Sequence, residues 1–212
     1  MATLLKVDNL DIIDIYFNKY TKARIFGKGP SFQILEKDND NTLHICVNDS
    51  FNHIPEVDIL TTNDIEVFDY LNLEKMKNLK FLICPNHPHF KGIACPNITW
   101  EDVYYKIKDY FNGVMIVYNL RTWSSPNVKF ITFPSAITGS NTSNDFVCLF
   151  LNKYIKEIDF YGIAKLVPPS TCYNDLFKTP FVYNYSNPSF MNMLRENLEQ
   201  TCSSHNIIYR FN

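Results

Sequence analysis

The chain has 212 residues, 46% of them hydrophobic, and a formal net charge of −2. This length suits one large domain or two small ones, and the near-neutral charge argues against nucleic acid or an anionic membrane as a partner. The opening "MATLLKVDNLDIID" lacks the apolar core of a signal peptide, and no apolar run is long enough to cross a bilayer. We therefore expect a cytoplasmic protein, and a homo-oligomer stays open.

Short apolar runs alternate with helical patterns along the chain, without a repeat or a linker. The expected strands are residues 23–26, 43–47, 57–61, 79–84, 113–118, 128–133, 157–162 and 206–210. The expected helices are residues 8–21, 31–37, 64–72, 100–112, 143–154 and 188–203. This alternation, with strands apolar along their whole length, is typical of a mainly parallel sheet covered by helices on both faces. The sequence therefore predicts a single α/β domain over residues 1–212.

Cysteine usage favours reduced thiols over a disulfide framework. The six cysteines form no C-x-x-C pair, and several lie inside apolar runs, as expected of buried thiols in an intracellular protein. The nearest approach to a metal cluster is "CPNHPHF", which holds His87 and His89 between Cys84 and Cys95. Its spacing matches no standard zinc site. We expect a plain loop there.

The stretch "RIFGKGPSFQIL" (24–35) raises the question of what its glycines do. Gly27 and Gly29 permit a tight turn after the first long strand, and Pro30 suits the first position of a helix. A strand that runs through such a turn into a helix leaves free N–H groups at the positive end of the helix dipole. That arrangement predicts an anion site, usually for a phosphate. The same turn is also a common way to change direction.

Polar residues follow several of the expected strands directly. They are Asn48, Asp49 and Ser50, then Thr62, Asn63 and Asp64, and later "PSAITGSN" (134–141) and the loop after "DFYG". In open parallel sheets, ligands bind outside the carboxyl ends of the strands. Small hydroxyl and amide side chains there bind phosphates and sugars, which makes Asn63 a donor-binding candidate. Each turn can equally cap its next helix, and Asp64 is the clearest candidate for an N-cap.

Two segments in a fixed order resemble sialyltransferases of the eukaryotic family 29 and the bacterial family 42. The first is "GKGPS" (27–31) followed by "HICVND" (44–49), which is similar to the bacterial Gly-Asn-Gly-Pro-Ser turn and the next strand ending in asparagine. The second is "KFITFPSAITGSNTSNDFVCLFLNKYIKEIDFYGIAKL" (129–166), with a Pro-Ser-x-Thr-Gly type of loop, a helix and an "EIDxYG"-like strand end. The matching pieces span roughly residues 23–200.

The resemblance implies a Rossmann-like glycosyltransferase that uses CMP-sialic acid and no metal or other cofactor. Its partners would be a nucleotide sugar and a glycan acceptor. Gly27, Gly29 and Ser31 would surround the phosphate, and Asn48 would contact the nucleotide or the donor sugar. The remaining donor-site residues that it implies are Ser135, Thr138, Gly139, Ser140, Tyr161 and Gly162.

This chain departs from the family at two places. Lys28 replaces the asparagine of the turn, which adds a phosphate-binding charge or indicates a different donor. The family's catalytic histidine would fall near Asn184, between Tyr183 and Tyr185, and Ser189 stands where eukaryotic members have an acidic residue. An asparagine cannot accept the proton of the acceptor hydroxyl.

Other side chains can replace the missing base, which is worth about two to four powers of ten in rate. His53, in a loop beyond Asn48, is the histidine to test first, and Asp49 and Asp64 lie at the expected edge. Three tyrosines can donate to the departing phosphate or simply pack as aromatics, namely Tyr173, Tyr183 and Tyr185.

Two alternatives stay open beside an active transferase. One is a catalytically weakened relative that binds a nucleotide or a glycan without turnover. The missing histidine and the small size favour it. The other is an unrelated nucleotide-dependent enzyme of the pyrophosphokinase type that shares only the "GKGPS" turn.

Overall fold

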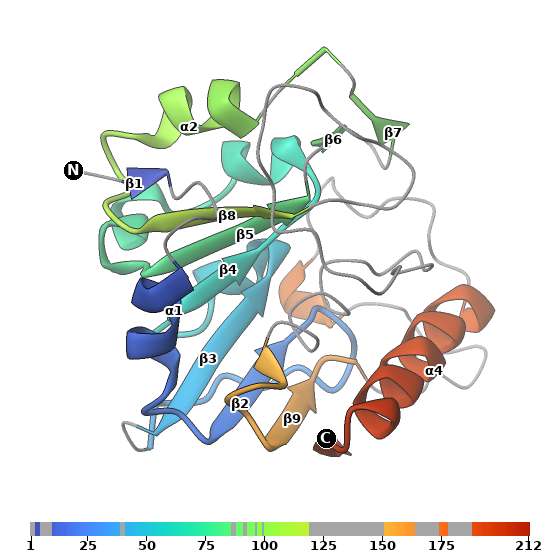
Figure 1. The fold of residues 1–212 in the computed structure, drawn as a ribbon. Coiled ribbons are helices and arrows are strands. Elements are labelled where there is room, and N and C mark those ends of the chain that lie inside the picture. The colour runs from blue at the N-terminus through green and yellow to red at the C-terminus, as the bar shows by residue number, and fades with distance from the viewer. Residues whose placement is uncertain are drawn as a thin grey trace.

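The computed structural model describes residues 3–4, 10–38, 41–85, 88–90, 93–95, 97–98, 100–118, 151–163, 174–177 and 188–212. Its centre is an eight-stranded sheet with strand order β1-β8-β5-β4-β3-β2-β9-β10 (Figure 1). In that order the strands are Thr3–Leu4, Val114–Tyr118, Phe81–Pro85, Ile59–Thr61, Thr42–Val47, Lys22–Phe26, Glu157–Tyr161 and Ile208–Phe211. The short strands β6 (His89–Phe90) and β7 (Ile93–Ala94) form a separate antiparallel pair.

The helices that accompany the sheet are of two kinds. The α-helices are α1 (Leu10–Phe17), α2 (Trp100–Ile107) and α4 (Pro188–Ser204). The 3-10 helices are η2 (Asn48–Asn52), η3 (Ile65–Asp69), η4 (Leu73–Asn78) and η5 (Asp175–Phe177). Of the connections that the structure describes, those from β3 to β4 and from β4 to β5 are made by short 3-10 helices, and the longest described helix is α4, with 17 residues.

The order of the strands reverses beside β2. From β2 the chain proceeds through β3, β4 and β5 to β8 on one side, whereas β9 and β10 lie on the other side. Each pair of neighbours in this sheet is parallel, so the carboxyl ends of β2, β3, β4 and β9 share one edge. A reversal of this kind between β2 and β9 marks the place where open α/β sheets bind ligands.

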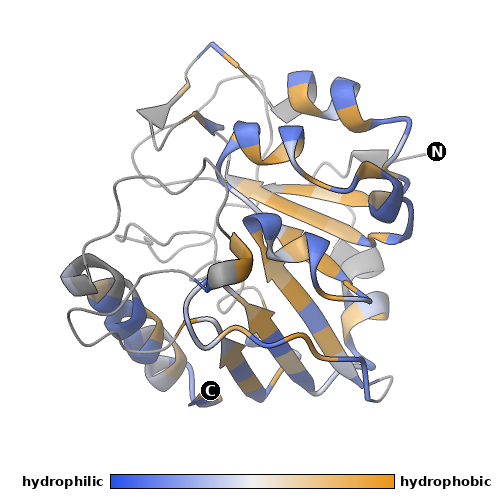
Figure 2. Ribbon diagram, turned by 180° about the vertical axis from the view of Figure 1, so that it is seen from behind, coloured by the Kyte–Doolittle hydropathy of each residue, from blue (hydrophilic) through white to orange (hydrophobic). Residues whose placement is uncertain are grey.

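Each face of the sheet is covered by a different set of helices. Alternate residues of the strands point to opposite faces, so Ile25 and Phe26 enter separate clusters of buried residues. The cluster around Ile25 includes residues of α1 and α4, and the cluster around Phe26 includes residues of α2, η2, η3 and η4. Figure 2 shows the strands mostly in the hydrophobic colour beside mixed helices. The predicted α/β class, with helices on both faces of a parallel sheet, is confirmed.

The predicted helix over 31–37 is wrong, because residues 32–38 have no regular structure. The N–H of Phe32 donates to the carbonyl of Gly29 and closes a turn instead of starting a helix. Further along, the carbonyl of Glu36 accepts from the Arg24 guanidinium, whose other nitrogen pairs with Asp38 at 2.6 Å. These contacts hold the segment extended beside β2. The predicted helix over 64–72 is replaced by the shorter 3-10 helix η3.

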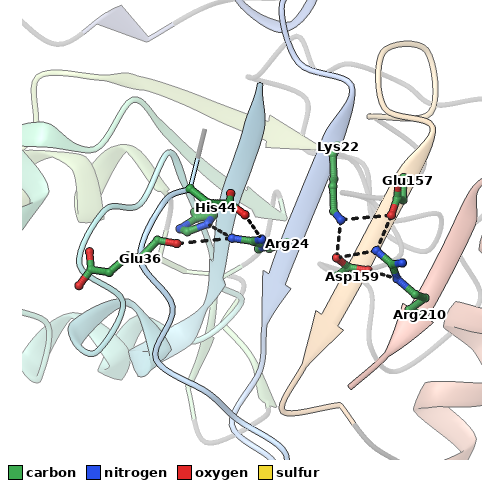
Figure 3. A network of polar contacts seen from close by, with 8 residues as sticks. Lys22, Arg24, Glu36, His44, Glu157, Asp159 and Arg210 are labelled. Atoms are coloured by element: carbon green, nitrogen blue, oxygen red, sulfur yellow. Dashed lines mark hydrogen bonds and ion pairs between the residues drawn. The ribbon is translucent and has the colours of Figure 1, made fainter. Parts of the chain in front are cut away.

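Charged side chains, rather than apolar ones, connect the last strands on the face of the sheet that carries Phe26. Asp159 of β9 accepts from Nε of Arg210 at 2.7 Å and pairs with Nζ of Lys22 at 2.8 Å (Figure 3). Burial raises the pKa of Asp159, but the bonds from Arg210 and Lys22 outweigh it, so the pKa lies below its ordinary value. The network therefore joins β2, β9 and β10 as ionised partners.

Candidate functional site

The Gly27–Ser31 turn packs directly on Gly162, backbone against backbone. The Gly27 N–H donates to the Tyr161 carbonyl at 2.8 Å, and the Gly29 N–H donates to the Gly162 carbonyl at 2.7 Å. The Gly162 N–H in turn donates to the Ser31 hydroxyl at 3.1 Å. The two segments that resemble sialyltransferase motifs on β2 and β9 therefore meet at the reversal of strand order.

These bonds overturn the expectation of free N–H groups at the glycines. The Gly27 amide is hydrogen-bonded to the last residue of β9 and the Gly29 amide to the loop after it, and no helix dipole follows the turn in the described residues 32–38. The glycines are needed for close approach, because a Cβ on Gly29 would lie 2.6 Å from the Gly162 carbonyl oxygen. Gly162 itself has a φ of +71°, which favours glycine. The turn thus fixes two strand ends, and the amides of Gly27 and Gly29 are not available to a ligand.

The side chain of Lys28 supplies a cation at this edge. Its Nζ lies 2.9 Å from Oδ1 of Asp49, and the two side chains are 16% and 5% exposed. Asp49 belongs to η2, which starts directly after β3. The ion pair therefore bridges the ends of β2 and β3 and holds the amine close to the reversal of strand order.

Asn48 carries two features that its packing does not explain. Its φ is +55°, in the left-handed region that asparagine tolerates better than most residues. Its buried Oδ1 has no hydrogen-bond partner among the residues described. A buried polar atom without a partner costs free energy and needs an explanation, such as a ligand. The neighbouring Ser50 is structural, since its hydroxyl donates to the Phe26 carbonyl at 2.8 Å.

His53 lies just beyond η2 and packs among aromatic rings. Its ring centroid is 6.1 Å from that of Phe32 and 5.0 Å from that of Phe177, both edge to face. The segment containing Phe177 covers the glycine turn, because the Asn174 N–H donates to the Lys28 carbonyl at 2.8 Å. The structure thus gives the imidazole of His53 a packing role.

Asp64 follows β4 at the same edge and takes the N-cap position of η3. Its side chain makes no capping bond there, although its N–H donates to the Thr62 hydroxyl at 3.2 Å. Burial and the nearby Glu66 raise the pKa of Asp64 to about 6, against a smaller opposing effect of Lys28. The expected capping bond is therefore not formed in this described segment, and the pKa of the Asp64 carboxyl group is about 6.

The other predicted residues divide into those placed near this edge and those outside the described residues. Asn63 follows β4, where its carbonyl accepts from the His89 N–H at 2.6 Å. Tyr161 ends β9, and its ring stacks on Phe26 at 5.5 Å. Residues Ser135, Thr138, Gly139, Ser140, Tyr173, Asn184 and Tyr185 lie outside the described part, as do most of the helix predicted over 143–154 and all of the strand predicted over 128–133.

A hollow of about 470 Å³ lies at the opposite edge of the sheet, near the amino ends of β4 and β5. Three lysines line it, but each is already committed to a protein partner. Lys37 and Lys80 both bind Asp58 at 2.8 Å, and Lys75 donates to the Phe51 carbonyl at 2.6 Å. We place the candidate site at the carboxyl edge because the strand order reverses there and because Asn48 presents an Oδ1 without a partner among the described residues.

Among the described residues, no three His, Cys, Asp or Glu side chains are grouped so that they could hold a metal ion. Nor does any helix in the described ranges have the length and apolar character needed to cross a membrane. In the part of the chain that the structure describes, four cysteines are not joined in disulfides, namely Cys46, Cys84, Cys95 and Cys202.

Replacing Asp64 by asparagine is expected to stabilise the protein at pH 8 by about 1–2 kcal/mol, a value reduced for partial exposure to water. The folded carboxyl keeps its proton up to a pKa of about 6, above its ordinary value of 3.8. Stability therefore falls as pH rises between these values, and the uncharged amide of the variant removes that loss. Urea unfolding at pH 8 and pH 4 measures the difference, which should shrink at the lower pH. An equal difference at both pH values would contradict the raised pKa.

Comparison of the chain with protein-family models, with curated proteins and with solved structures gives no significant match. The resemblance to sialyltransferases therefore rests on the quoted motifs and their order. Of these motifs, the turn 27–31, the strand end 44–49 and the strand end 157–162 lie in the described residues, at neighbouring strand ends.

Proposed function

We propose that this protein is a sialyltransferase-like glycosyltransferase that moves a sugar from a CMP-sugar donor to a hydroxyl group of a glycan acceptor. The observation that carries the proposal is the contact of the Gly27–Ser31 turn with Gly162 between β2 and β9. It joins two of the family-like motifs at the position where this class of sheet binds ligands. Side chains suited to a nucleotide sugar stand beside it.

Lys28 and Asn48 have complementary tasks in this reaction. When the donor bond breaks, the phosphate of CMP gains one negative charge, which a nearby ammonium group stabilises. Asp49 holds the Lys28 amine at 2.9 Å, so the cation is positioned before the donor binds. The Oδ1 of Asn48, unpartnered among the described residues, is available to accept a hydrogen bond from a hydroxyl or amino group of the donor.

Nucleotide binding tests the proposal most directly. We expect CMP and CDP to raise the melting temperature of the purified protein, with UDP and GDP giving smaller shifts. Lys28→Met should remove most of the CMP shift, because it removes the phosphate-facing cation. Lys77→Met is the matched control, since Lys77 is exposed and pairs only with Glu74 of its own 3-10 helix among the residues described. A shift with GDP and none with CMP would contradict the CMP-sugar assignment.

A second candidate function is a nucleotide- or glycan-binding relative without turnover. The observation that favours it is the packing of His53 between Phe32 and Phe177, because this ring was the leading replacement for the missing catalytic histidine. CMP release from CMP-sialic acid separates the two functions. Tight CMP binding with no release of CMP, in water or with lactose as acceptor, would favour the binding protein.

A further inference from the structure

We propose that Asp64 is the group that takes the proton from the acceptor hydroxyl. This inference rests on the proposed function, since it assigns the base that sugar transfer requires. The chain lacks the family's histidine near position 184, so another group must serve. Asp64 is a carboxylate at the carboxyl end of β4, on the same edge as the turn after β2 and the Lys28–Asp49 pair.

Asp49 and Asp64 have different surroundings, and the difference separates their tasks. The Asp49 carboxylate is occupied by Lys28 at 2.9 Å and positions that amine. The Asp64 carboxylate forms no capping hydrogen bond with the described residues of η3, so its oxygens are available to an incoming hydroxyl. Three residues earlier, at the end of β4, the Thr61 hydroxyl is fully buried and without a hydrogen-bond partner in the described ranges, a second polar group near this strand end whose packing leaves it unsatisfied.

Burial is the largest cause of the raised pKa of Asp64, and charged groups on neighbouring segments add to it or oppose it. Glu66 of η3 disfavours the ionised carboxylate, while Lys28 of the glycine turn favours it. Lys28 is itself paired with Asp49 at 2.9 Å, and His89 of β6 is bridged to Asp64 through the backbone. With burial added, the pKa is raised to about 6. Such a group is mostly ionised at pH 7 and is a stronger base than an ordinary aspartate.

Asp64 would assist the attack of the acceptor hydroxyl on the donor sugar. The O–H bond of the acceptor breaks, and its proton passes to a carboxylate oxygen of Asp64. The acceptor oxygen forms the new bond to the anomeric carbon of the donor sugar. The bond from that carbon to the phosphate oxygen breaks, and its electron pair leaves with CMP, beside the cation of Lys28.

The test is the pH profile of CMP release from CMP-sialic acid with lactose as the probe acceptor. We expect Asp64→Asn to lower the rate about 100-fold or more at pH 7.5 while CMP affinity is retained. Asp69→Asn is the matched control, an exposed aspartate at the end of the same 3-10 helix, and should keep the wild-type rate. Glu66→Gln should move the acidic limb of the profile to lower pH, because it removes a charge that raises the pKa of Asp64.

The outcomes separate this inference from the proposed function. A wild-type rate and an unchanged acidic limb in Asp64→Asn would overturn the role of Asp64 and leave the transferase standing. CMP binding by the wild type without any CMP release would overturn the role of Asp64 and favour the binding protein. If the wild type binds no CMP at all, both proposals fail together.

Discussion

Gly162→Ala is expected to destabilise the protein by about 2–4 kcal/mol, from left-handed strain and from forced overpacking. Gly162 has a φ of +71°, and a Cβ there would lie 2.7 Å from the Gly27 carbonyl oxygen. The atoms in the way are backbone, so neither loop can yield without losing the bonds between them. Chemical denaturation of the purified variant measures the loss.

Asn206→Ala serves as the matched control for backbone strain. Asn206 also has a left-handed φ, +57°, but it lies in an exposed turn after α4. Its replacement should cost about 1 kcal/mol or less, because strain alone is involved. If Gly162→Ala costs no more than this control, the contact between the two loops is not tight.

Asp58→Ala is expected to cost about 3–5 kcal/mol, the range for breaking a buried ion pair from one side. The Asp58 carboxylate is 3% exposed and binds Lys37 and Lys80 at 2.8 Å each. It also accepts from the His44 N–H at 3.0 Å and the Tyr16 hydroxyl at 3.4 Å. Removing it leaves two ammonium groups without their buried partner. Asp109→Ala, at an exposed turn, should change the free energy of unfolding by less than about 0.5 kcal/mol.

The Asp58 carboxylate also makes the free energy of unfolding depend on pH. Burial raises the pKa of Asp58, but bonds from Lys37, Lys80 and the His44 N–H outweigh it, so the folded pKa lies below the ordinary value of 3.8. Its contribution is therefore present above about pH 4 and is lost as pH falls through the folded pKa. The difference between wild type and Asp58→Asn should be largest near pH 7 and shrink below pH 4. A constant difference down to pH 2 would contradict this linkage.

The sheet was predictable because its signal is local. Apolar runs such as "LHICV" and "LKFLIC" are buried on both faces in a parallel sheet, and each is found as a strand. The segment after the glycine turn was not predictable in this way. Its proline and serine read as a helix start, but Ser31 instead accepts from Gly162, a residue 131 positions away. Tertiary bonds of this kind override a local pattern.

The sequence predicted which residues lie at the candidate site, but not the contacts that their side chains make. Sequence reasoning selected the strand ends that share an edge, because carboxyl ends of parallel strands lie together. It could not show that Lys28 pairs with Asp49. Nor could it show that the Asp64 side chain makes no capping bond with the described residues of η3 and has its pKa raised by Glu66. These features depend on burial and on charges from separate elements. The sequence therefore favours His53 as the replacement base, whereas our proposal assigns that task to Asp64 because His53 packs between aromatic rings and Asp64 makes no capping bond with the described residues of η3.

The position of β9 in the sheet has a consequence for synthesis of the chain. Until β9 emerges from the ribosome, β2 is an open edge strand, and the turn after it lacks its partner Gly162. An unpaired parallel edge with apolar residues invites association with other nascent chains. Most strands of the sheet are therefore synthesised before β9, which lies in the last quarter of the chain, can cover the edge of β2. Truncated products that stop before β9 should aggregate rather than fold.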